Sequence, residues 1–143
     1  MRIKESKRLI ETVIIEYISD DGKRFKTERE CVAYENLRDA IKKEFVKIQT
    51  KPEAANLMNI DGQEHYCDAN YDWYFPKNEH EIAILKEYYA DPDAAFNHNC
   101  IGKWICVEDG EWATGISTLE DGIEHAKKLL NMFGYDVVKM EEK

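Results

Sequence analysis

The chain has 143 residues, with 29 acidic and 20 basic side chains and a formal net charge of −9 at pH 7. This length suits one domain with a small appendage, and it is enough to bury a core without a disulfide or a structural metal. The negative charge argues against duplex nucleic acid as a partner, since such proteins usually present a basic face. We expect neither a secretion signal nor a membrane span. Four cysteines without a dense framework suit a reducing compartment, so a cytoplasmic location is expected.

The first part of the chain predicts a β-hairpin. Thr12–Ile18 is rich in β-branched residues, and a second short strand over Lys23–Lys26 follows it after Asp21-Gly22. Asp-Gly between two such runs is a strong hairpin signal, because the tight turn needs positive φ at its central positions.

A long helix is predicted next. Thr27 fits an N-cap with Glu30 three residues later, and the helix is expected to end near residue 49, before Lys51-Pro52. The apolar residues recur every three or four positions and predict one buried stripe: Cys31, Tyr34, Leu37, Ile41, Phe45 and Ile48.

The rest of the chain predicts a second unit. Its elements are, in order, a strand over 71–75, a helix over 78–89, strands over 103–108 and 111–116, a helix over 117–133 and a strand over 135–140. This is the ferredoxin-like βαββαβ order. We therefore predict an α+β protein with a hairpin and helix module over 1–51, a connection over 52–65 and a ferredoxin-like unit over 66–143, or one compact domain overall.

Two further predictions concern this unit. Ser117 is the expected N-cap of the last helix, Gly134 is its expected C′ glycine, and its buried stripe is predicted to be Ile123, Ala126, Leu130 and Phe133. Tyr74 and Trp73 are adjacent on their strand and therefore point to opposite faces. We expect the Tyr74 side chain to be the most exposed of the local aromatic residues.

Two His-x-Cys pairs raise the question of zinc. His65 and Cys67, and likewise His98 and Cys100, would point to one side of an extended segment and together supply four ligands. The usual zinc-site spacings are absent, so we favour ordinary buried cysteines and loop histidines and expect no cofactor. No nucleophile elbow or phosphate-binding glycine loop is present, and we do not predict an enzyme.

Charge is divided unevenly along the chain. Residues 1–51 carry 13 basic and 10 acidic side chains, whereas residues 52–143 carry 7 and 19, and no arginine follows Arg38. Arg24, Lys26 and Arg29 lie near the predicted helix start, where a small anion is favoured. The alternative is a solvated basic face that pairs with the acidic half of a neighbouring subunit. Both interpretations favour a homo-oligomer.

The segment Tyr17–Glu35 resembles the start of many small phage and prophage proteins of Gram-positive bacteria, in which a hairpin with an Asp-Gly turn leads into a helix containing Glu-Cys-x-x-Tyr-Glu. Proteins with this opening include anti-defence sponges, among them the Thoeris anti-defence kind. The resemblance implies a non-catalytic oligomer in the host cytoplasm that captures cyclic nucleotide immune signals. The lack of arginine after Arg38 departs from the basic residues expected of such a site.

Two functional hypotheses follow. In the first, the protein sequesters a small anionic ligand, a cyclic nucleotide or ADP-ribose-type signal, with phosphates on Arg24, Lys26 and Arg29 and the base stacked on Tyr74. In the second, the acidic second half docks on a basic host protein through a set of carboxylates: Asp68, Asp72, Glu108, Asp109 and Glu111. Neither hypothesis includes duplex nucleic acid or a membrane as a partner.

Overall fold

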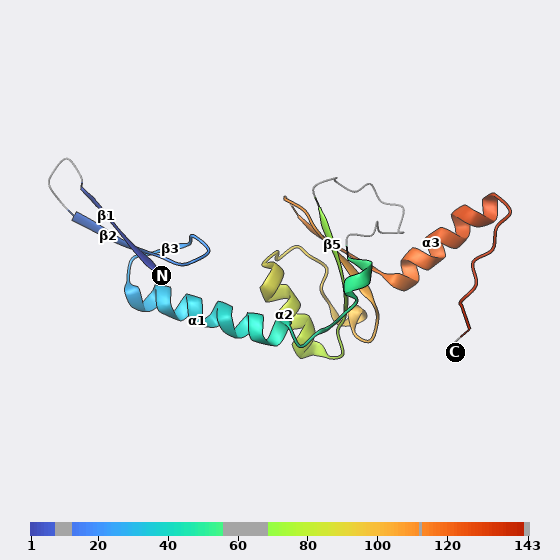
Figure 1. Ribbon diagram of the computed structural model, residues 1–143, viewed down its shortest axis with the longest axis horizontal. Coiled ribbons are helices and arrows are strands. Elements are labelled where there is room, and N and C mark those ends of the chain that lie inside the picture. Colours follow the sequence, from blue (N-terminus) through green and yellow to red (C-terminus); the bar gives the residue numbers. More distant parts are fainter. Residues whose placement is uncertain (8–12, 56–68, 112, 142–143) are drawn as a thin grey trace. The chain divides into compact units, whose positions relative to one another are not determined.

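Helices and strands are both present, which confirms the predicted α+β class (Figure 1). The structure is a computed structural model, and it describes residues 1–7, 13–55, 69–111 and 113–141. Contacts divide the chain into two compact units, Met1–Glu44 and Phe45–Lys143. Within the described residues, no helix combines the length and the apolar character needed to cross a membrane.

The first unit begins with a three-stranded antiparallel sheet in the order β1 (Arg2–Lys7), β2 (Val13–Ile18) and β3 (Arg24–Phe25). The predicted hairpin between β2 and β3 is confirmed. Gly22 has a φ of 91°, and the backbone N–H of Ser19 donates to the carbonyl of Lys23 at 2.9 Å. β1 was not predicted, because its sequence is rich in charged residues and does not resemble a β-branched run.

Helix α1 (Glu28–Phe45) follows, and the hydroxyl of Thr27 accepts the N–H of Glu30 at 3.2 Å, as the capping pattern predicts. The helix ends four residues earlier than expected. Ile48, the last member of the predicted stripe, is instead buried in the core of the second unit. Leu37 is 58% exposed, so the prediction that it belongs to a buried stripe is wrong.

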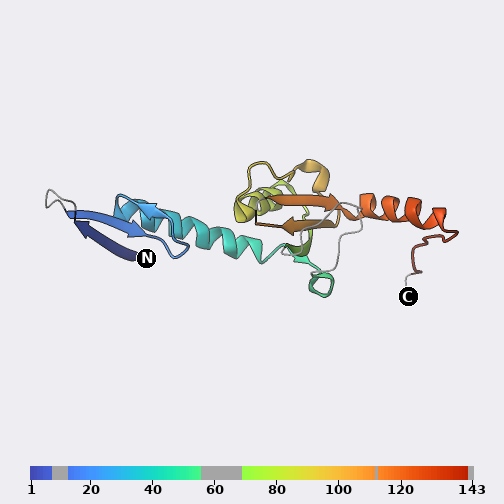
Figure 2. The same ribbon diagram turned by 90° about the horizontal axis from the view of Figure 1, so that it is seen from above.

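The second unit contains a four-stranded sheet in the order β4 (Gln49–Thr50), β5 (Asn70–Phe75), β6 (Ile105–Asp109) and β7 (Thr114–Thr118), and every pair is antiparallel. Figure 2 shows β6 and β7 running side by side in opposite directions. The other elements of this unit are short turns and two helices: η1 (Pro52–Ala54), α2 (Glu79–Tyr89), η2 (His98–Cys100) and α3 (Leu119–Met132).

This topology corrects the ferredoxin-like prediction in two respects. A split βαβ unit joins parallel strands through a crossover helix, whereas α2 leads from β5 to its antiparallel neighbour β6. The expected last strand is missing, since residues 135–140 form no strand and lie largely exposed. Their apolar residues resemble a strand in sequence, but the described sheet ends at β7.

One face of the four-stranded sheet forms the core together with α2 and the loop that follows it. The buried members of this cluster are Ile48, Tyr74, Ile82, Leu85, Ala94, Phe96, Cys100, Ile105 and Val107. The register pairs Tyr74 with Ile105 and Asp72 with Val107, so these four side chains share the face that α2 covers. The predicted N-cap of α2 is confirmed, because the side chain of Asn78 accepts the N–H of Glu81 at 3.0 Å.

Helix α3 differs from its predicted burial. Thr118, one residue after the expected Ser117, is its N-cap and accepts the N–H of Asp121 at 3.2 Å. Gly134, with a φ of 86°, closes the helix as predicted. The predicted burial of the stripe is wrong at its end, since Leu130 is 38% and Phe133 73% exposed. An amphipathic pattern marks an apolar face but does not supply the surface that covers it.

Candidate functional site

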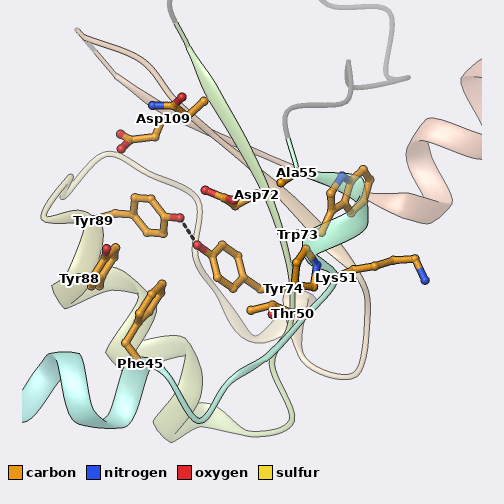
Figure 3. Close-up of a pocket in the computed structure, with 12 residues that line it drawn as sticks. Phe45, Thr50, Lys51, Ala55, Asp72, Trp73, Tyr74, Tyr88, Tyr89 and Asp109 are labelled. Carbon is orange, nitrogen blue, oxygen red and sulfur yellow. Dashed lines mark hydrogen bonds between the residues drawn. The ribbon is translucent and has the colours of Figure 1, made fainter.

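A cavity of about 500 Å³ lies in the second unit, beside β5 and the end of α2. Its size is in the range of cavities that hold small organic ligands. Five of its lining residues are aromatic: Phe45, Trp73, Tyr74, Tyr88 and Tyr89. Three others are charged: Lys51, Asp72 and Asp109. Figure 3 shows Asp72, Asp109 and the hydroxyl ends of two tyrosines around the same space.

Strand alternation explains how β5 and β6 contribute. Asp72 and Tyr74 are two residues apart and point to the same face of β5. Asp109 pairs with Asn70 and lies diagonally opposite Asp72 on that face. Diagonal neighbours of this kind are about 7–8 Å apart at the backbone, so both carboxylates belong to the same part of this face.

The remaining rings come from the ends of two helices. Phe45 is the last residue of α1, and Tyr88 and Tyr89 close α2. The helix stops there because Ala90 adopts the left-handed conformation, with a φ of 52°.

The rings form a connected wall. Phe45 and Tyr88 stack face to face with ring centroids 3.7 Å apart, and Tyr88 meets Tyr89 edge-on at 5.2 Å. Tyr89 also stacks on Phe96 at 5.8 Å, which ties the wall to the core. The hydroxyls of Tyr74 and Tyr89 share a hydrogen bond (Figure 3).

Burial raises the pKa of Tyr74 to about 12, and the charges of Asp72 and Asp109 add to this effect. Burial also raises the pKa of Tyr89 well above its ordinary value. Its hydrogen bond to Tyr74 and the charges of Asp72 and Asp109 raise this pKa further. Both phenols are therefore protonated at neutral pH. Their hydroxyls can therefore donate or accept hydrogen bonds.

The two carboxylates have few partners. Within the described ranges, the Asp72 carboxylate makes no hydrogen bond or ion pair, and the Asp109 carboxylate accepts the hydroxyl of Thr114 at 3.4 Å. Asp91 holds Thr114 in turn, accepting its backbone N–H at 2.8 Å. Lys51 does not neutralise them, since its Nζ lies 4.0 Å from the Glu53 carboxylate and points away from the tyrosine pair (Figure 3).

No protein-family model, curated protein or solved structure matches this chain. The site is therefore assessed from its own geometry.

The predicted anion site lies in the first unit. Arg24, Lys26 and Arg29 are all exposed, and Arg24 Nη1 lies 3.5 Å from the Glu16 carboxylate. Glu28 and Glu30 stand in the first turn of α1 beside Arg29, where they compete with an external anion for the positive end of the helix. These three cations line neither of the described cavities.

The prediction that Tyr74 is exposed is wrong. Its side chain is 4% exposed, because the face of β5 that carries it is the face that α2 covers. Tyr74 also belongs to the second unit, whereas Arg24, Lys26 and Arg29 belong to the first. Its hydroxyl is occupied by Tyr89.

The predicted zinc ligands are only partly described, because His65 and Cys67 lie outside the described residues. His98 and Cys100 lie on a 3-10 turn, not on the extended segment that would point both side chains to one side. His98 is exposed, whereas Cys100 is buried with its Sγ 3.8 Å from the carbonyl of Ala95. Among the described residues, no group of three or more His, Cys, Asp or Glu is placed to hold a metal.

The carboxylates of the acidic-surface hypothesis do not share one surface. Asp72 and Asp109 face the cavity, whereas Glu108 alternates with Asp109 and points to the opposite face of the sheet. Glu111 is exposed in the loop between β6 and β7, and Asp68 lies outside the described residues.

The sequence analysis did not predict the cavity. Two signals for it were present in the sequence: the i, i+2 spacing of Asp72 and Tyr74 on one strand, and the adjacent pair Tyr88-Tyr89.

Proposed function

We propose that this protein is a non-catalytic binding protein and that the aromatic cavity of its second unit holds a small organic ligand. The observation that carries the proposal is the combination of about 500 Å³ of space with five aromatic residues in its lining. Aromatic walls with a few polar groups are the usual composition of small-molecule sites.

The geometry favours stacking as the main contact. Phe45 and Tyr88 already form a face-to-face pair, and Tyr88 and Tyr89 meet edge-on. A planar ligand ring in the cavity would contact these aromatic side chains in the same two ways, face to face or edge to face. Tyr74 and Tyr89 are protonated at neutral pH, so their hydroxyls can hydrogen-bond to a polar group on such a ligand.

Ligand-observed NMR with a set of monocyclic aromatic fragments tests this proposal. We expect saturation transfer to some of these fragments from the unaltered full chain. Phe45→Ala should lose most of this transfer, because it removes the partner that holds the Tyr88 ring. Phe133→Ala is the matched control, since Phe133 is 73% exposed and outside the cavity.

Circular dichroism of both variants establishes that they are folded before binding is compared. Absence of transfer from the unaltered chain to every fragment would overturn the proposal. Equal transfer in the folded Phe45→Ala variant would also count against this cavity as the site.

Sequestration of a cyclic nucleotide or ADP-ribose-type signal is the second candidate function. It is favoured by the exposure of all three cations near the start of α1. If phosphates bind there, the double variant Arg24→Ala and Arg29→Ala should lose calorimetric binding of cyclic AMP and ADP-ribose while it stays folded. Arg2→Ala removes one exposed positive charge from the same unit and is the control. Unchanged titration curves in the double variant would rule out this siting.

A further inference from the structure

We infer that the aromatic cavity selects ligands that carry a protonated amine over neutral and anionic ligands of the same shape. This inference rests on the proposed function and names the ligand class for the same site. Its basis is the placement of Asp72 and Asp109 at one end of a wall of aromatic rings (Figure 3).

The carboxylates provide the first step. Asp72 is half-buried and lacks a counter-cation among the residues that the structure describes, while Asp109 is exposed and meets only the Thr114 hydroxyl there. A half-buried charge is less screened by water than an exposed one, so Asp72 should contribute more of the attraction. An ammonium group beside Asp72 would gain charge-assisted hydrogen bonds that a neutral group lacks, and the charge of Asp109 would add attraction from a greater distance.

The rings provide the second step. A cation is attracted to the face of an aromatic ring, and this attraction grows when water is excluded. The hydroxyls of Tyr74 and Tyr89 bond to each other, and each phenol oxygen has further acceptor capacity with which it can accept from an ammonium donor. An amine on a planar ring would therefore use both the carboxylates and the stacking surface.

Anions are disfavoured by the same arrangement. Lys51 is the basic member of the lining, and its Nζ is directed to Glu53. The surrounding part of the chain is strongly acidic, since residues 52–143 hold 7 basic and 19 acidic side chains. A phosphate or carboxylate would enter a negative potential, and the described lining residues offer no cation other than Lys51 to meet it.

A metal ion is a weaker occupant than an organic cation. Calcium takes six to eight oxygen ligands, and magnesium needs near-octahedral coordination. Within the described residues the cavity offers two aspartates, and no larger cluster of metal-ligating side chains forms. The abundance of aromatic rings also has no use in a metal site.

Calorimetric titration of the full chain with three probes of similar shape tests the inference. The probes are phenethylamine, which is cationic at neutral pH, phenethyl alcohol, which is neutral, and hydrocinnamate, which is anionic. We expect phenethylamine to bind about tenfold or more tightly than phenethyl alcohol, and hydrocinnamate not to bind detectably.

Variants then assign the selectivity to residues. Asp72→Asn should weaken phenethylamine about tenfold and leave phenethyl alcohol unchanged, and Asp109→Asn should cause a smaller loss. Glu111→Gln removes the same charge from the exposed β6–β7 loop and should leave all three titrations unchanged. Circular dichroism shows that each variant is folded.

The outcomes separate the two proposals. If phenethyl alcohol or hydrocinnamate binds as tightly as phenethylamine, the inference is wrong and the proposed function stands. Equal losses with Glu111→Gln and Asp72→Asn would assign the attraction to general charge and would also overturn the inference. If none of the three probes binds, the proposed function itself is contradicted.

Discussion

Replacing Phe96 by alanine is expected to lower the free energy of unfolding of the second unit by about 3–5 kcal/mol. Phe96 is 1% exposed and is among the largest fully buried side chains. Its removal leaves a void in the core, and it also withdraws the ring that stacks on Tyr89 at 5.8 Å. The same variant should therefore bind aromatic probes more weakly, because one wall of the cavity loses its support.

Urea unfolding followed by circular dichroism measures this loss. Phe133→Ala is the matched control, because Phe133 is 73% exposed and its truncation should change the free energy of unfolding by less than about 0.5 kcal/mol. If both variants lost a similar free energy of unfolding, Phe96 would not be the buried core residue that the structure shows.

Replacing Asp91 by alanine is expected to cost about 1–3 kcal/mol, although Asp91 is only partly buried. Its carboxylate accepts the backbone N–H of Thr114 at 2.8 Å and that of Asp93 at 3.0 Å. Thr114 is 9% exposed, so its N–H has little access to water when the acceptor is lost. The effect should extend to binding, because the Thr114 hydroxyl donates to Asp109 at the rim of the cavity.

The Asp91→Asn variant separates hydrogen bonding from charge. The amide oxygen can still accept one of the two N–H groups, so this variant should lose less than half as much stability as Asp91→Ala in urea unfolding. Equal losses would indicate that the negative charge, not the hydrogen bonds, holds the loop to β7. A loss below about 0.5 kcal/mol in both would contradict the role assigned to Asp91.

Local signals in the sequence predicted much of the fold. The Asp21-Gly22 turn and the caps at Thr27 and Asn78 depend on contacts within a few residues, and each is present. The strands β5, β6 and β7 likewise follow from short β-rich runs. These features need no knowledge of the rest of the chain, because their partners are close in sequence.

Features that depend on distant partners were not predictable in this way. The pairing of β5 with β6 across α2 and the recruitment of Gln49–Thr50 as β4 depend on which surfaces meet in space. The exposed Leu130 and Phe133 show the same limit, since a helical stripe does not say whether its own chain covers it.

The candidate site was predictable only in part. Alternation along β5 places Asp72 and Tyr74 together, but it does not tell which face of the strand meets α2. If the Trp73 face of the strand met α2, Tyr74 would be exposed, which was the expectation from sequence. Tyr74 is instead buried, and its hydroxyl bonds to that of Tyr89. Arg24, Lys26 and Arg29 are close together in the sequence, so a pattern of charges could indicate them. The cavity is lined by residues from β5, β6 and the ends of two helices, which are far apart in the sequence.

The most direct test is a backbone and side-chain NMR titration of the full chain with phenethylamine. We expect saturable shifts that follow one binding curve at Asp72, Tyr74, Tyr89 and Asp109, with the signals of Arg24 and Arg29 unmoved. Shifts concentrated at Arg24 and Arg29, or the absence of saturable shifts at the four cavity residues, would contradict the assignment of this cavity as an amine-binding site.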